Sequence, residues 1–203
     1  MTLRECYAQP WRHFHTWDHI ERVQRAAQWY YQRLQGTGTP PAVTRAIFWH
    51  DAVYLPGAAD NEEKSVELYK SEEAIKMSRH AEVWVAQTIR ATKEHIRGFM
   101  GMHGMYCPRN VMLSCDLVSL AAPWDVFCTD EENILKEYRY AYEDAKCKQG
   151  RLAFLEGMLA HPYIYPHPDF ELSHGPRARA NLQRAVREAK PITFVRYKRY
   201  LPV

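Results

Sequence analysis

The sequence predicts an all-α fold, and two patterns support this prediction. Apolar residues recur at the three- and four-residue spacing of helices along most of the 203-residue chain. The alternation of apolar and polar residues that is typical of strands is scarce. A chain of this length fits one domain, and we expect a single domain over 1–203, with a core over about 7–160 and a C-terminal helix and tail over about 161–203.

The first predicted helix spans 16–35, where Ile20, Val23 and Ala27 fall on one face. It ends in a segment rich in glycine and proline that begins at Gly36. Proline suits the first turn of a helix, so the Pro-Pro pair at 40–41 predicts a second helix over 42–53. His50 shares the apolar face of that helix, and we expect its imidazole to point toward the interior.

The rest of the chain is predicted to alternate helices with short loops. Asp60 and Glu63 have the spacing of a capping box, which predicts a loop at 55–60 and a helix over 61–78. Further loops are expected at 93–108, which contains several Gly and Met residues, and at 161–168, which is interrupted by prolines. The other predicted helices cover 80–92, 109–121, 130–148, 150–160 and 176–189.

Composition excludes several classes of protein. The formal net charge of +3 is small for a nucleic-acid-binding protein, so no nucleic-acid partner is expected. The five cysteines include no Cys-x-x-Cys pair, which argues against a zinc ribbon or a disulfide framework and favours reduced thiols. No segment has the length and apolar character of a membrane span or signal peptide. We therefore expect a cytoplasmic protein without a membrane partner; the apolar helical faces permit a homodimer but do not require one.

Two histidines and two acids form a candidate ligand set for a divalent metal. His50 and Asp51 are adjacent near the end of a predicted buried helix, and Asp116 is a single acid in an apolar helix. A buried carboxylate is costly unless it is paired or bound to a metal. His19 is preferred as the fourth ligand because it directly precedes the apolar stripe of the first helix. A solvent-facing polar pair at 50–51 and a helix cap or salt bridge at Asp116 are the structural alternatives.

Imidazole and carboxylate ligands together suit Mn, Fe, Co, Ni or Zn, and Mg is also considered. Two acids that follow the candidate ligands, Asp60 and Glu62, are predicted either to cap a helix or to take a catalytic part at the metal. His95 is a third candidate catalytic residue, with a second-metal ligand, a phosphate contact and a surface histidine as its alternatives.

Several residues are candidates for binding an anionic substrate. His15 is expected to orient a ligand or to contact phosphate, with a capping or core histidine as its alternative. The other candidates near the loops and on the last helix are cationic or polar, and a surface position is the alternative for each of them. They are Lys93, Arg177, Arg179 and Asn181.

These residues together resemble the HD-domain superfamily of metal-dependent phosphohydrolases, and most closely its bacterial and phage branch of predicted phosphohydrolases. The resemblance extends from about residue 7 to 182, and the combination of motifs is specific although the His-Asp pair alone is not. The matching stretches are Tyr7-Ala-Gln-Pro-Trp-Arg-His-Phe-His15-Thr-Trp-Asp-His19-Ile, Phe48-Trp-His50-Asp51-Ala-Val-Tyr54, Asp60-Asn-Glu62-Glu-Lys-Ser65, Thr92-Lys-Glu-His95 and Ala178-Arg-Ala-Asn181-Leu182.

The resemblance implies an HD-type helical bundle that binds its metal in the core through His19, His50, Asp51 and Asp116. It also implies hydrolysis of a phosphoester or phosphoanhydride, most often in a nucleotide, with Asp60 and Glu62 near the scissile phosphate. The sequence therefore predicts a nucleotide phosphohydrolase in which metal-activated water attacks phosphorus. Trp17 and Tyr54 are expected to stack on the base of the substrate.

Two other classes of function remain open from the sequence. The first is a nucleotide-binding or sensing module that keeps the fold without turnover. The second is a di-iron oxygenase on the same fold, for which His80, His95 and Glu62 would supply extra ligands. If the main prediction of a phosphohydrolase holds, the substrate is a small phosphate ester.

Overall fold

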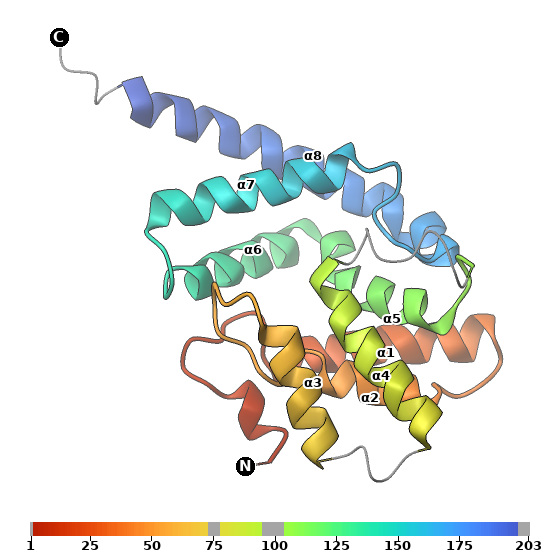
Figure 1. Ribbon diagram of the computed structural model, residues 1–203. Helices are drawn as coiled ribbons and strands as arrows, with labels where there is room; N and C mark the ends of the chain where they lie inside the picture. Colours follow the sequence, from red (N-terminus) through yellow and green to blue (C-terminus); the bar gives the residue numbers. More distant parts are fainter. Residues whose placement is uncertain (1, 73–77, 95–103, 199–203) are drawn as a thin grey trace.

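The computed structural model describes residues 2–72, 78–94 and 104–198, with side chains to residue 189, and this part of the chain contains helices and no strand. In Figure 1 the three C-terminal helices, over 124–198, lie one above another, above the helices formed by the first 116 residues. The elements in chain order are η1 (Glu5–Tyr7), α1 (Trp17–Leu34), α2 (Pro41–Trp49), α3 (Asn61–Glu72), α4 (Arg79–Ala91), η3 (Thr92–Glu94), α5 (Pro108–Asp116), η4 (Leu117–Ala121), α6 (Trp124–Tyr138), α7 (Asp144–Ala160) and α8 (Pro168–Lys198).

The apolar stripes predicted from the sequence form the core of the protein. The stripe of α1 is fully buried at Ile20, Val23 and Ala27, as is Ile47 on α2. α1 packs against α5 and α2, and α2 packs against α4 and α5. The burial of large apolar side chains against one another supplies most of the stability of such a bundle. The all-α prediction is confirmed over the described residues.

The second helix ends earlier than predicted, and this places the candidate ligands. α2 stops at Trp49, and His50 is its C-cap, with its backbone N–H still bonded to the carbonyl of Ala46 at 3.0 Å. His50 is therefore buried at the end of a helix, and Asp51 begins the loop that follows. Because the helix ends here, the adjacent side chains of His50 and Asp51 reach the same site. They would point in different directions if the helix continued to 53.

The predicted division between the two helices near residue 149 is wrong. The break lies at 139–143, where the backbone N–H groups of Tyr140 and Ala141 bond the carbonyls of Glu137 and Tyr138 in a turn. Gly150 lies within α7 rather than at a boundary. The last helix also begins earlier than predicted, at Pro168, and continues past the Gly-Pro pair at 175–176 because long-range packing holds it together.

The loop between α2 and α3 lies against the turn between α6 and α7. Gly57 has a φ of 81°, and a Cβ there would lie 2.8 Å from the Cβ of Ala141. Only glycine allows this backbone conformation together with this close approach. The contact holds the loop that carries Asp51 beside the start of α7, so these two segments form opposite sides of one cleft.

The five cysteines are free, in agreement with the prediction of reduced thiols. Within the described part of the chain, no single helix combines the length and apolar character that a membrane span requires. One sharply bent pair, Pro108–Ala121 with Trp124–Tyr138, meets these criteria only as a pair.

Candidate metal centre

His50 presents a buried nitrogen without a hydrogen bond to the candidate centre. Its Nδ1 donates to the carbonyl of Ile47 at 2.8 Å, which fixes the ring and leaves Nε2 on the other side. Nε2 is buried and has no hydrogen-bond partner of normal geometry. It lies 3.1 Å from Oδ2 of Asp51 and 3.3 Å from Oδ1 of Asp116. A metal-binding histidine typically has this arrangement, with one ring nitrogen held by a carbonyl and the other directed at the site.

Three elements bring the four predicted ligands together. His19 lies in the first turn of α1, His50 and Asp51 follow α2, and Asp116 ends α5. Nε2 of His19 lies 2.9 Å from Oδ1 of Asp116 and 4.0 Å from Oδ2 of Asp51. The donor atoms of His19, His50 and Asp51 all lie within 4.8 Å of one another. These three donors, with Oδ1 of Asp116 beside both imidazoles, fit a single divalent transition metal.

The charges of the cluster also fit a bound cation. Burial lowers the pKa of His50, but Asp51 and Asp116 outweigh burial and raise it well above the ordinary value. Burial raises the pKa of Asp51, but His50 outweighs it and holds this pKa below the ordinary range. The pKa of His19 is lowered, chiefly by burial. The two carboxylates thus retain a proton on His50, and a divalent cation would replace that proton on binding.

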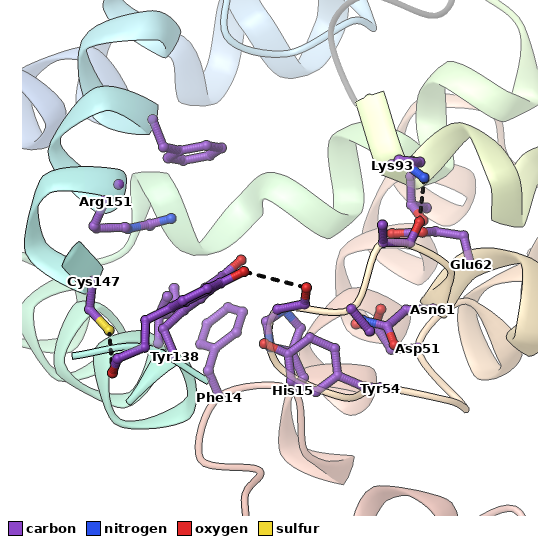
Figure 2. A pocket seen from close by; sticks show the side chains of 18 of the residues that line it. Phe14, His15, Asp51, Tyr54, Asn61, Glu62, Lys93, Tyr138, Cys147 and Arg151 are labelled. Atoms are coloured by element: carbon purple, nitrogen blue, oxygen red, sulfur yellow. Dashed lines mark hydrogen bonds between the residues drawn. The ribbon is translucent and has the colours of Figure 1, made fainter. Parts of the chain in front are cut away.

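The cluster opens into a cleft with a volume of about 870 Å³. Asp51 and Asp116 lie at one end of its lining, and α7 supplies the other end with Arg151 and Phe154. Figure 2 shows Asp51, Glu62 and Lys93 on one side and Cys147 and Arg151 on the other. A single phosphate group would fill only a part of this volume, so the cleft accommodates a substrate with a sizeable organic group.

The predicted catalytic residues occupy different surroundings. Glu62 is half-buried and lines the cleft. Asp60 is exposed, pairs with Lys64 at 2.9 Å, and is not part of the lining. The described contacts of Asp60 are thus a charge pair at the start of α3, and the side-chain bonds of the predicted capping box are not among them. His95 lies outside the described residues.

The predicted substrate residues divide into two groups. His15, Tyr54 and Lys93 line the cleft, and the ammonium group of Lys93 donates to the carbonyl of Ala59. The other four candidates do not line the cleft; they are Trp17, Arg177, Arg179 and Asn181. Trp17 stacks on Phe48 with ring centroids 5.6 Å apart.

The remaining three substrate candidates lie on α8. Arg179 donates to the carbonyls of Leu159, His161 and Pro162, and Asn181 donates to those of Leu120 and Ala122. Arg177 is exposed. Arg179 and Asn181 thus hold α8 against neighbouring segments through backbone carbonyls.

Sequence reasoning missed Glu137, a fully buried acid on α6. Its carboxylate accepts hydrogen bonds from backbone N–H groups at 13–15, and it also contacts His15 Nδ1 and the Tyr54 hydroxyl. The signal was present, because Glu137 falls on the buried face of α6 with Phe127 and Ile134. An isolated acid on an apolar face needs a partner, which is the argument that selected Asp116.

Nothing matches this chain in comparisons with protein-family models, with curated proteins or with solved structures.

Proposed function

We propose that the protein is a metal-dependent phosphohydrolase that acts on a small phosphate ester or phosphoanhydride, namely a nucleotide. The observation that supports the proposal is the His19, His50, Asp51 and Asp116 cluster at one end of a cleft of about 870 Å³. The resemblance of the motifs to HD-domain phosphohydrolases points to the same chemistry.

The four residues of the cluster would hold the metal. A divalent ion such as Mn, Co, Zn, Fe, Ni or Mg supplies charge for a phosphoryl oxygen and lowers the pKa of a bound water. Glu62, on the wall of the cleft, would orient the attacking water and accept its proton. Lys93 contributes a positive charge at the same wall, where it would offset the charge of the phosphate.

The remainder of the cleft would hold the organic part of the substrate. Phe14, Tyr54, Tyr138 and Phe154 contribute aromatic surface to the lining. Aromatic rings stack favourably on nucleic-acid bases. This surface, together with the size of the cleft, supports a nucleotide over a smaller phosphate ester.

The first experiment is a substrate screen with purified protein. Ribo- and deoxynucleoside mono- and triphosphates are tested with Mn, Co, Mg and Zn supplied separately, and released phosphate, pyrophosphate and triphosphate are resolved. Metal-dependent release from one or two substrates is the expected result. Absence of release across the panel, with metal bound, would contradict the proposal and favour a binding module.

The cluster itself is tested with Asp51→Ala. Removal of a ligand carboxylate should lower both metal content and turnover, on the order of 100-fold or more. Asp18→Asn is the matched control, because it removes an exposed acid one residue from His19 and leaves the cluster intact. Full turnover and normal metal content in Asp51→Ala would refute the assignment of the centre.

A further inference from the structure

Glu137 forms an unusually complete hydrogen-bonding network for a buried carboxylate. Oε1 accepts the backbone N–H groups of His13, Phe14 and His15 at 2.8, 2.7 and 2.8 Å. Oε2 lies 2.6 Å from Nδ1 of His15 and accepts the hydroxyl of Tyr54 at 3.0 Å. The side chain is fully buried. Taking a carboxylate out of water is costly, and here five donors compensate for that cost.

This network fixes both the backbone and the ring of His15. Three successive N–H groups at 13–15 point at one oxygen atom, so the segment before α1 is held against α6. The ring is further confined by Tyr54, with centroids 4.2 Å apart, and by the edge of Phe14, at 4.9 Å. An imidazole restrained in this way keeps a single orientation, which is what a residue acting on a substrate requires.

This orientation of the His15 ring leaves its Nε2 available to the cleft. Nδ1 is engaged with Glu137, and among the described residues no hydrogen bond involves Nε2. His15 lines the cleft together with Asp51 and Asp116, and its side chain is 21% exposed. In Figure 2, His15 lies between Phe14 and Tyr54, near Asp51. His15 is therefore close to the position that the phosphate would take if the proposed function holds.

We propose that His15 is a catalytic residue that donates the Nε2 proton to the leaving oxygen, and that Glu137 is the positioning residue for it. The inference rests on the proposed phosphohydrolase function. Water oxygen bonds to phosphorus as the bond from phosphorus to the leaving oxygen breaks. The electron pair of that bond passes to the leaving oxygen, which takes the proton from His15. Glu62 accepts one proton from the attacking water, and solvent exchange restores both residues.

Two other residues are less suited to this task. Asp60, which the sequence suggested as a catalytic residue, is exposed, paired with Lys64 and outside the lining of the cleft. Glu62 lines the cleft, but no described network like that of Glu137 fixes the orientation of its side chain. We therefore assign Glu62 to the attacking water.

The experiment uses phosphomonoesters that differ in leaving group. A poor alkoxide leaving group, as in a nucleoside 5′-monophosphate, needs a proton, whereas p-nitrophenolate leaves without one. In His15→Gln we expect kcat to fall by about 100-fold or more for the alkyl ester and less than about 10-fold for p-nitrophenyl phosphate. Glu137→Gln should show the same dependence, because an amide N–H facing Nδ1 disfavours the doubly protonated imidazolium that can release a proton from Nε2.

Two controls separate this role from a structural one. Tyr54→Phe removes one hydrogen bond to Glu137 but leaves the contact with His15, so its effect should not depend on the leaving group. The proton that joins His15 Nδ1 to Glu137 should give a far-downfield NMR resonance that disappears in both His15→Gln and Glu137→Gln. Metal content and the thermal midpoint are measured for each variant, and His15→Gln decides the test if Glu137→Gln does not fold.

In His15→Gln, an equal decrease in kcat for all leaving groups, or an increase in KM alone, would refute the role of His15. The proposed function would remain intact. Absence of any metal-dependent hydrolysis by the unmodified protein would overturn both. A leaving-group dependence in His15→Gln with unchanged metal content supports the assignment.

Discussion

At the scale of single residues, His19, His50, Asp51 and Asp116 depend on one another for charge and for orientation. Nε2 of His50 is within 3.3 Å of both acids, and the carbonyl of Ile47 keeps the ring in place. Removal of any one member would leave a buried charge or a buried polar group without its neighbour. Such losses are costly in protein interiors.

Glu137 leads to a prediction about stability in acid. Burial raises its pKa, but His15 and the backbone N–H groups outweigh burial and lower it to about 2. Because the pKa is lower in the folded state, the stabilisation is complete above the ordinary value of 4.5 and is lost as the pH falls toward about 2. The free energy of unfolding should decrease by roughly 3 kcal/mol across this window.

The measurement is chemical denaturation of the unmodified protein and of Glu137→Gln between pH 6 and about 2.5. The difference between the two free energies of unfolding should become smaller as the pH falls, because protonated Glu137 resembles the neutral amide. A difference that stays constant over this range would contradict the role of the ionised carboxylate.

At the scale of the elements, Asn181 is one of the polar side chains that attach α8 to the rest of the protein. Asn181 is buried, and its Nδ2 donates at 2.9 Å to the carbonyls of both Leu120 and Ala122. These carbonyls lie at the end of η4, just before α6 begins. The amide thus satisfies two carbonyls at the C-terminal end of η4, where helix carbonyls lack donors within the helix.

Replacement of Asn181 by alanine should therefore destabilise the protein. We expect a loss of about 1–3 kcal/mol in the free energy of unfolding, because two buried carbonyls lose their donor. Gln183→Ala, an exposed position on the same helix, is the control and should change stability little. Equal midpoints of urea denaturation for the two variants would show that the Asn181 contacts contribute nothing.

At the scale of the whole molecule, the candidate centre connects segments that are far apart in the sequence. α1, the end of α2 and the end of α5 each supply ligands, and the same helices form much of the core. A metal that binds only the folded protein stabilises it by mass action. The centre therefore couples metal binding to global unfolding.

A divalent metal that fits the candidate centre should raise the midpoint temperature of thermal unfolding. The expected stabilisation is about 2.7 kcal/mol at a metal concentration one hundred times the dissociation constant. The effect should disappear in His50→Gln and persist in Asp18→Asn. Differential scanning calorimetry with and without metal measures it, and an undiminished shift in His50→Gln would place the metal elsewhere.

Local patterns in the sequence were enough to predict the helical class, most helix positions before residue 122, and two histidines and two acids that the fold brings together. These follow from local information: apolar spacing, glycine and proline punctuation, and acids placed among apolar residues. The boundaries of α6, α7 and α8 could not be read in this way, because packing carries α7 through Gly150 and α8 through the Gly-Pro pair at 175–176.

Only the tertiary structure decided which polar residues share the cleft. Asp60 and Glu62 look equivalent in the sequence, yet only Glu62 lines the cleft. Asn181 resembled a substrate contact and instead bonds two carbonyls. The contact between His15 and Glu137 joins residues 122 positions apart. The physical reason is that hydrogen bonds and burial depend on distances across the folded chain, which a local pattern does not contain.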